Sequence, residues 1–262
     1  MSLAPIALFV YNRPDHTRQT IEALLENRLA VESDLFIFSD APKTIEAENA
    51  VNEVREYLKT IVGFRLVTIT EREVNSGLAN SIIDGVTRLC DEYGRVIVLE
   101  DDLITSPYFL KYMNDALRKY QNEEKVMHIS GYMFPIETSS ERDSFFLHLT
   151  NSWGWGTWSR AWKHFDSMSS GYDSLKMDVA LKREFNLNNS RPFFTMLENQ
   201  LAGEVDSWAI RWYLSVFKLR GLSLVPSNSL VANIGLDGSG THCGVEEKRL
   251  TAIQPDFMVN SF

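Results

Sequence analysis

Cysteine is scarce in this chain. Only Cys90 and Cys243 occur among 262 residues, far apart and at no spacing typical of a metal site, so neither a disulfide framework nor a zinc ribbon is expected. No apolar stretch reaches the roughly 18 residues that a membrane-spanning helix needs. The N-terminus also lacks the basic segment of a signal peptide. We therefore expect a cytoplasmic protein, and leave open its attachment to the inner face of the membrane.

Basic residues are in the minority. The chain has 26 Lys and Arg against 35 Asp and Glu, which gives a net charge of −9. Such a charge repels polyanions, so a nucleic-acid partner is not expected. The 14 glycines and 8 prolines are too few for a low-complexity or fibrous chain, and 44% of the residues are hydrophobic, as in ordinary globular proteins.

Short apolar runs alternate with helical segments in the first hundred residues. The runs 6–11, 35–39, 64–69 and 96–99 predict strands buried on both faces of a parallel sheet, and segments 15–27, 44–62 and 78–93 predict helices between them. Beyond residue 125 we predict short strands at 126–130 and 145–149 and helices near 191–202 and 207–220. The pattern indicates one α/β domain, residues 1–262. Its first half, 1–125, forms a mostly parallel sheet flanked by helices, and its second half, 126–262, forms an α+β lobe.

Neither standard phosphate-binding loop follows the first predicted strand, which argues against dinucleotide-dependent oxidoreductases and P-loop nucleotidases. Ligands of such sheets bind beyond the carboxyl ends of the strands. There Glu100, Asp101 and Asp102 follow a buried strand, where three adjacent carboxylates are costly unless a cation joins them. Mg²⁺ or Mn²⁺ prefers such ligands and leaves positions for phosphate oxygens. The alternative is that the triplet only ends the strand and caps a helix.

Polar residues also follow the other strands. Arg13 could pair with a phosphate or a nucleobase, or form an ion pair at a helix start. Asp40 could accept hydrogen bonds from a ribose or a base, or simply occupy a turn. The segment from Asn75 to Gly77 precedes a helix, so it offers free N–H groups to a ligand or a cap to that helix.

The second half has three further candidate sites. Trp153, Trp155 and Trp158 alternate with glycines, and such flat aromatic faces suit a sugar ring, although a packed structural role is the alternative. Asp206 precedes an apolar helix. It could act as a general base at the edge of a pocket, or it could simply be the N-cap of that helix. His242 lies in a glycine-rich loop that could close over a site and deliver a metal or phosphate contact.

Several segments together carry a resemblance to a known family. In the first half they are PIALFVYNRPDHTRQTIEAL, FIFSDA, NSGLANSI and VIVLEDD, and in the second half GWGTWSRAW, VDSWAIRWYL and GSGTHC. The chain resembles nucleotide-sugar glycosyltransferases of the GT-A fold. It is similar to the N-acetylglucosaminyltransferase I group and to bacterial enzymes of surface-polysaccharide synthesis. The EDD triplet looks like the metal motif of these enzymes.

The resemblance implies roles for individual residues. Asp102 would be the principal metal ligand, supported by His242. Glu100 and Asp101 would contact ribose or metal-bound water, and Asp40 would bind uracil or ribose. The nucleotide-sugar-binding set would also include Arg13, Asn75 and Gly77. Asp206 would be the base, and the tryptophans 153, 155 and 158 would contact the acceptor.

The implied activity is transfer of a hexosyl or N-acetylhexosaminyl group. The donor would be a nucleotide diphosphate sugar, most often a UDP-sugar, and the acceptor a hydroxyl of a glycan or lipid-linked molecule. The metal, Mn²⁺ or Mg²⁺, would stabilise the leaving diphosphate while a carboxylate activates the acceptor, which inverts the anomeric configuration. The alternatives are a sugar-nucleotide pyrophosphorylase, which would carry a glycine-rich loop after the first strand, and a non-catalytic carbohydrate-binding module.

Overall fold

The computed structural model describes residues 2–136, 142–236, 253–254 and 256–262. Its strands are β1 (Ile6–Val10), β2 (Asp34–Ser39), β3 (Leu66–Glu71), β4 (Arg95–Glu100), β5 (Leu103–Thr105), β6 (Val126–Ser130), β7 (Ser144–Leu147), β8 (Trp155–Trp158), β9 (Leu222–Pro226) and β10 (Val231–Asn233). Its α-helices are α1 (Pro14–Leu25), α2 (Glu48–Leu58), α3 (Leu78–Tyr93), α4 (Phe109–Lys119), α5 (Ser159–Trp162), α6 (Tyr172–Met177), α7 (Val179–Phe185), α8 (Phe193–Leu201) and α9 (Trp208–Lys218).

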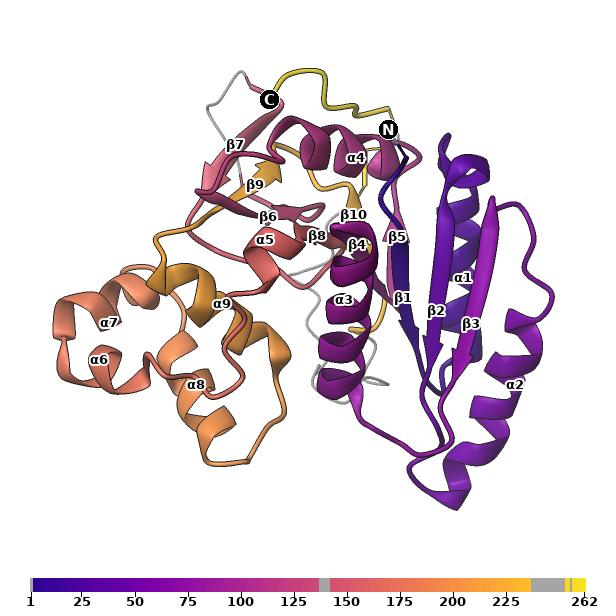
Figure 1. The fold of residues 1–262 in the computed structure, drawn as a ribbon, viewed down its shortest axis with the longest axis horizontal. Helices are drawn as coiled ribbons and strands as arrows, with labels where there is room; N and C mark the ends of the chain where they lie inside the picture. The colour runs from indigo at the N-terminus through magenta and orange to yellow at the C-terminus, as the bar shows by residue number, and fades with distance from the viewer. Residues whose placement is uncertain (1, 137–141, 237–252, 255) are drawn as a thin grey trace.

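One large sheet runs through both halves of the chain. Its strand order is β3-β2-β1-β4-β8-β6-β9-β7, and β10 pairs with β5 in a small second sheet (Figure 1). Strands β8 and β7 run antiparallel to their neighbours, while the other six strands share one direction. Helices flank this sheet, so the predicted fold class, a mostly parallel α/β sheet flanked by helices, is confirmed.

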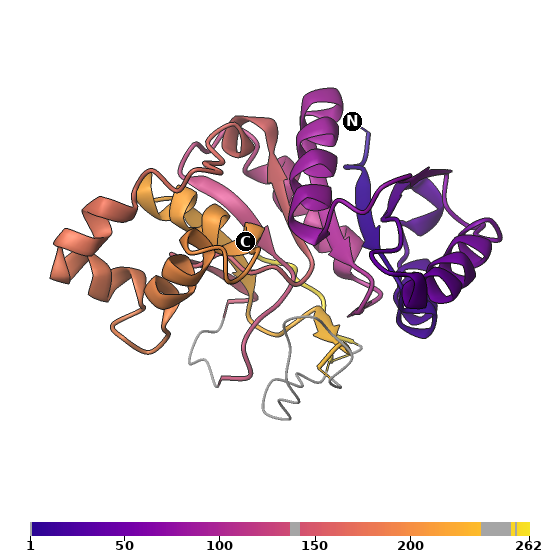
Figure 2. The ribbon, with the colours of Figure 1, turned by 90° about the horizontal axis from the view of Figure 1, so that it is seen from below.

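Alternate side chains of β1 face opposite sides of the sheet and explain its two helical layers. Ile6, Leu8 and Val10 belong to a core cluster with side chains of α1, α2 and α4. Ala7 and Phe9 belong to a second cluster with side chains of α3, α5 and α9. Because both faces are covered, the strand reads as a continuous apolar run. Seen from below, α3 and the α1–α2 pair lie on opposite sides of the sheet (Figure 2).

The helix predicted over residues 78–93 forms with the same bounds. Two glycines explain why its ends are sharp. Gly77 before the helix and Gly94 after it both have a φ of +76°, a conformation that costs glycine little and other residues more. Helices α8 and α9 and strand β6 also lie where the sequence predicted them.

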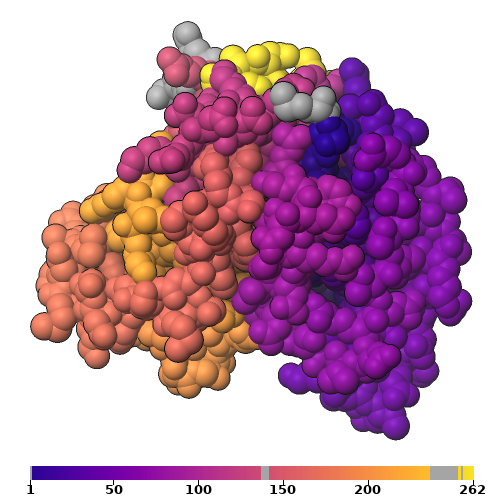
Figure 3. Space-filling view, viewed as in Figure 1, coloured from indigo at the N-terminus to yellow at the C-terminus, as the bar shows by residue number. Residues whose placement is uncertain are grey.

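The second half joins the sheet in its interior. Strand β8 lies between β4 and β6, with Val98 opposite Trp155, so residues of both halves share one sheet. Helices α6 to α9 surround a separate apolar cluster that includes Phe185, Phe194 and Leu214. In the space-filling view the residues of α1 to α3 and their strands form one side of the molecule and residues of α6 to α9 the other (Figure 3).

Within the described part of the chain, every helix is too short or too polar to cross a bilayer. The predicted location in the cell stays a prediction.

Candidate functional site

The carboxyl ends of β1, β2 and β4 meet at one edge of the sheet. Phe9 pairs with Glu100 and Val10 with Ser39, so the residues that follow these strands emerge side by side. Arg13 comes after β1, Asp40 directly after β2, and the acidic triplet at the end of β4. Residues far apart in the sequence are thereby brought to the edge where parallel sheets bind ligands.

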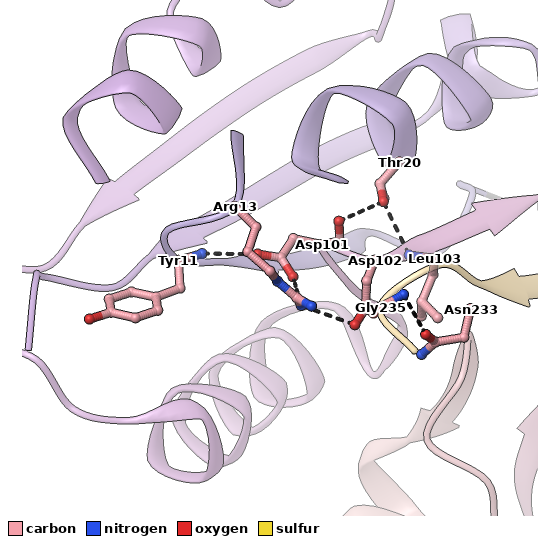
Figure 4. Close-up of polar contacts among 8 residues, drawn as sticks. All are labelled: Tyr11, Arg13, Thr20, Asp101, Asp102, Leu103, Asn233 and Gly235. Carbon is pink, nitrogen blue, oxygen red and sulfur yellow. Dashed lines mark hydrogen bonds and ion pairs between the residues drawn. The ribbon is translucent and has the colours of Figure 1, made fainter. Parts of the chain in front are cut away.

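Arg13 forms an ion pair with two carboxylates of the triplet (Figure 4). Its Nη2 atom donates a close hydrogen bond to Oδ1 of Asp101 and a second one, of 3.0 Å, to Oδ2 of Asp102. The backbone N–H of Tyr11 donates to the other oxygen of Asp101, at 3.3 Å. Asp101 and Asp102 are only 4% and 8% exposed. Arg13 is therefore the positive charge that the protein itself supplies to these buried carboxylates.

The turn that carries the two aspartates is held by its backbone. The hydroxyl of Thr20, on α1, donates to the carbonyl oxygen of Asp101 at 2.9 Å and accepts from the N–H of Leu103 at 3.1 Å. The N–H of Ile234 donates to the carbonyl oxygen of Asp102 at 2.8 Å. These contacts come from both halves of the chain, so the carboxylates are presented by a rigid turn.

Negative charge exceeds positive charge in this cluster. Burial and the neighbouring charges of Asp102 and Asp101 raise the pKa of Glu100 to about 8, although Arg13 acts in the opposite direction. Burial also raises the pKa of Asp101, against the opposing effect of Arg13. Burial alone would lower the pKa of Arg13, but the two aspartates raise it above its ordinary value, so Arg13 stays charged. Among the described residues, the guanidinium of Arg13 faces the three carboxyl groups of Glu100, Asp101 and Asp102.

The donor chemistry of this cluster fits a hard divalent cation. Such ions need one or two protein carboxylates and fill their remaining positions with phosphate oxygens and water. In the described residues no group of three or more acidic, histidine or cysteine side chains converges as a ligand set. Asp101 and Asp102 could therefore hold a metal together with ligands that the substrate provides. In this structure Arg13 occupies the position between them.

The carboxylate of Asp40 is already hydrogen-bonded to backbone N–H groups of neighbouring loops. Its carboxylate accepts hydrogen bonds from the N–H groups of Ser76, at 3.0 Å, Gly77, at 2.9 Å, and Ala41, at 2.9 Å. The amide of Asn75 donates to the carbonyl oxygen of Ala41 at 2.6 Å. The predicted nucleotide-binding residues Asp40, Asn75 and Gly77 thus lie together. Since Asp40 already accepts from Gly77, that N–H group is not free for a ligand here.

Four residues that contact this region were not predicted as site residues from the sequence. The phenolic oxygen of Tyr11 accepts from the N–H of Lys43 at 2.8 Å, which links the Asp101 side of the site to the loop after β2. Thr20 lies on a helix face that periodicity assigns to the core. Asn233 and Gly235 lie at the start of the glycine-rich loop, in which only His242 was predicted to contact a ligand. Their proximity to Asp102 follows from the pairing of β10 with β5, which no local pattern reveals.

The tryptophans occupy different environments. Trp155 is 0% and Trp158 3% exposed, so neither ring has an open face for a sugar, which corrects the prediction that they contact an acceptor. Trp155 packs against the rings of Trp208 and His128, and the indole N–H of Trp158 donates to the carbonyl oxygen of Leu117 at 2.9 Å. Their placement in a central strand explains this burial.

Trp153 is partly buried, with its ring edge-to-face with that of Tyr132 at 4.5 Å. It is the one of the three predicted acceptor-binding tryptophans that keeps exposed surface. It therefore stays a candidate for acceptor contact.

Asp206 remains a solvent-accessible carboxylate at the start of α9. Its side chain is 57% exposed and pairs with Arg211 at 3.0 Å. The N-cap of α9 is Ser207, whose hydroxyl accepts from the N–H of Ile210, so the capping role considered for Asp206 falls to its neighbour. Among the described contacts, none joins Asp206 to the Arg13 cluster. His242, the predicted second metal ligand, lies outside the described residues.

Comparison with known proteins finds only distant structural similarities. No protein-family profile matches the sequence, and no curated protein matches it. Mannosyltransferase PcManGT from Pyrobaculum calidifontis, solved with GDP-Man and Mn²⁺, is 14% identical with a TM-score of 0.34, over 50% of this chain and 36% of that one. Mouse xyloside xylosyltransferase 1 is 12% identical with a TM-score of 0.44, over 82% of this chain and 81% of that one.

A third solved structure is similar at the same level. A UDP-glucose pyrophosphorylase in complex with UDP-glucose is 12% identical with a TM-score of 0.39, over 86% of this chain and 90% of that one. The chain spans 36% of the length of the mannosyltransferase.

Proposed function

We propose that this protein is a glycosyltransferase that moves a hexosyl or N-acetylhexosaminyl group from a nucleotide diphosphate sugar, a UDP-sugar in the first place, to a hydroxyl of a glycan or lipid-linked acceptor. The observation that carries the proposal is the buried cluster of Arg13, Asp101 and Asp102 at the carboxyl ends of β1 and β4. A cluster with excess carboxylate at this edge suits a bound cation and the diphosphate that the cation accompanies.

The chain's own residues have distinct tasks in this proposal. Asp102 and Asp101 hold Mn²⁺ or Mg²⁺, which supplies stabilisation of negative charge on the leaving diphosphate. Arg13 contacts the nucleotide diphosphate through its guanidinium. Glu100 and Asp40 line the ribose and base side, with Asn75 and Gly77 beside them. Burial of this edge strengthens each electrostatic contact, because water does not screen it.

Asp206 is our proposed general base. Its carboxylate is exposed and lies on the second half, whereas the diphosphate site lies on the first. A base that approaches the anomeric carbon from the side opposite the leaving group removes the acceptor proton as the acceptor oxygen attacks, so the configuration inverts. Asp206→Ala is expected to abolish turnover and to leave binding of the donor nucleotide intact. Full turnover in this variant would remove Asp206 from the mechanism.

The setting of the reaction is also part of the proposal. We assign the enzyme to the synthesis of bacterial surface polysaccharide, in the cytoplasm or at the inner face of the membrane, with Trp153 as acceptor contact. Trp153 is the predicted acceptor residue that the described structure leaves partly exposed. A reaction with a lipid-linked acceptor in vesicles, compared with the same glycan in solution, tests this assignment.

Two competing functions are less well supported by the site. A pyrophosphorylase would carry a glycine-rich loop after β1, but here α1 begins at Pro14, only four residues after the strand. A carbohydrate-binding module would expose its tryptophans, but Trp155 and Trp158 are buried. Release of pyrophosphate from a nucleoside triphosphate and a sugar phosphate would identify a pyrophosphorylase. Sugar binding without any nucleotide affinity would identify a carbohydrate-binding module.

The decisive experiment is calorimetric titration of UDP, GDP and CMP into the protein with and without Mn²⁺. The wild type is compared with Asp102→Asn, which removes one charge at constant shape. The matched control is Asp115→Asn, because Asp115 is an aspartate on α4 that pairs with Lys111 and Arg118 away from the site.

We expect metal-dependent nucleotide binding in the wild type and the control and its loss in Asp102→Asn. Absence of binding of all three nucleotides to a folded wild-type protein would refute the glycosyltransferase proposal. Equal binding by Asp102→Asn and the control would refute the assigned metal site.

A further inference from the structure

The hydrogen bonding of Arg13 is incomplete. Its Nη2 atom serves both Asp101 and Asp102, whereas its Nη1 atom is buried and has no hydrogen-bond partner among the described residues. Buried guanidinium donors are normally satisfied, so an unpaired one marks a place where a ligand oxygen can bind. An anionic oxygen is the best acceptor for it.

The surroundings of Asp102 limit how a cation can reach it. Its Oδ2 atom accepts from Arg13 on one side and faces the backbone of Gly235 on the other (Figure 4). A Cβ atom at position 235 would come within 2.9 Å of Cγ of Asp102 and 2.8 Å of Nη1 of Arg13. Since Gly235 flanks this oxygen on one side and Arg13 on the other, a cation that coordinates it competes with Arg13.

We propose that Arg13 couples the binding of the two ligands. In the ligand-free protein its guanidinium takes the place of the divalent cation between Asp101 and Asp102. A nucleoside diphosphate then offers its anionic oxygens to the guanidinium and draws it away from Asp102, which frees this carboxylate for the metal. The hydrogen bond to Asp101 is retained and keeps Arg13 in the site. This inference rests on the proposed function and adds to it a coupling residue.

The coupling has a consequence for affinity. If the diphosphate releases Asp102, it strengthens metal binding by the same factor by which the metal strengthens binding of the diphosphate. A hydrogen bond between charged groups contributes about 1.5 to 3 kcal/mol, which corresponds to roughly 10- to 150-fold in a binding constant. Removal of Arg13 should therefore increase the affinity of the nucleotide-free protein for Mn²⁺ by about tenfold or more.

The test uses Mn²⁺ alone as the probe, followed by electron paramagnetic resonance of free Mn²⁺. Arg13→Gln is compared with the wild type, with Arg13→Lys and with Arg65→Gln. Arg13→Lys keeps a positive charge in the site. Arg65→Gln is the matched control, since Arg65 forms an ion pair with the buried Asp34, at 2.7 Å from Nε, at the other end of the sheet.

We expect tight Mn²⁺ binding by nucleotide-free Arg13→Gln and weak binding by the wild type, Arg13→Lys and the control. Saturating UDP should bring the wild type close to Arg13→Gln. The melting temperature of Arg13→Gln should be lowered in chelator and restored by Mn²⁺, whereas that of Arg65→Gln should not respond to Mn²⁺ more than the wild type does.

The outcomes separate the two proposals. If the wild type binds Mn²⁺ with UDP, but Arg13→Gln binds Mn²⁺ alone no more tightly than the wild type, the coupling role of Arg13 is refuted and the proposed function stands. If no variant binds Mn²⁺ even with UDP, the metal site itself fails, and both proposals fall. Should Arg13→Gln not fold, the wild type alone tests the coupling. Equal Mn²⁺ affinity of the wild type with and without UDP would then refute it.

Discussion

The backbone at Gly235 lies so close to the Arg13–Asp102 pair that a single methyl group should disturb the site. In Gly235→Ala the added Cβ would lie 2.8 Å from Nη1 of Arg13 and 2.9 Å from Cγ of Asp102, distances that real Cβ atoms do not adopt. Gly235 does not have a left-handed φ, so the substitution introduces no backbone strain of its own. The effect of the variant is therefore purely steric.

Relief of this contact requires the loss of one hydrogen bond. Either the Asp102 side chain rotates away from Arg13, which breaks the 3.0 Å contact, or the backbone lifts and breaks the 2.8 Å bond from Ile234 to the Asp102 carbonyl oxygen. Loss of such a bond, or overpacking of this kind, costs about 1 to 3 kcal/mol. In a chain of this size that lowers the melting temperature by about 2 to 12 °C. Nucleotide binding should fall as well, because both side chains belong to the site.

Thermal melting and calorimetric titration of UDP with Mn²⁺ measure the two effects. Gly203→Ala is the control, since Gly203 has a φ of +74° and no atom lies within 4 Å of the added Cβ. That variant should lose about 1 to 2 kcal/mol through its backbone conformation and keep its nucleotide affinity. Wild-type stability together with wild-type nucleotide binding in Gly235→Ala would show that residue 235 does not approach Asp102 as described.

Two further predictions concern buried polar groups. Asp40→Asn should lower the free energy of unfolding, measured in urea, by about 1 to 3 kcal/mol, because an amide NH₂ group would then face backbone N–H groups that donate to the carboxylate. The control is Asp84→Asn, at an exposed ion pair, and a loss in Asp40→Asn no larger than in this control would contradict the prediction. Burial lowers the pKa of His128 to about 3, so below about pH 6.5 the unfolded chain binds a proton that the folded protein does not. The contribution of His128 to the free energy of unfolding should therefore fall by about 1.4 kcal/mol per pH unit from pH 6.5 toward pH 3, and the stability difference between wild type and His128→Gln should shrink over this range. A constant difference would count against a buried neutral His128.

Local sequence patterns were sufficient to predict the strands and helices of the first hundred residues. Strands β1, β2 and β4 are buried on both faces, so they read as continuous apolar runs, and glycines 77 and 94 mark the ends of α3. The edge strand β3 is only partly buried, which corrects the prediction that it is covered on both faces. The sequence also predicted that Arg13 and the acidic triplet lie at the same edge of the sheet, because the carboxyl ends of parallel strands meet there. Those signals are local in the chain, or follow from a general rule of parallel sheets.

Long-range pairing settled the position of β8 in the second half, whereas β6, α8 and α9 lie where the sequence predicted them. The Trp-Gly-Thr-Trp run reads equally well as an exposed sugar platform or as a core strand, and its pairing between β4 and β6 settled it as core. Gly156 lets this strand pack closely, since a Cβ there would lie 3.0 Å from the carbonyl oxygen of Val96.

The contacts around the carboxylates depend on the same kind of long-range pairing. Gly235 reaches Asp102 because β10 pairs with β5, and the Arg13–Asp101 contact joins residues 88 positions apart. A sequence pattern reports which faces of an element are apolar. It does not report which distant backbone will lie against them, because that depends on packing energies summed over the whole chain.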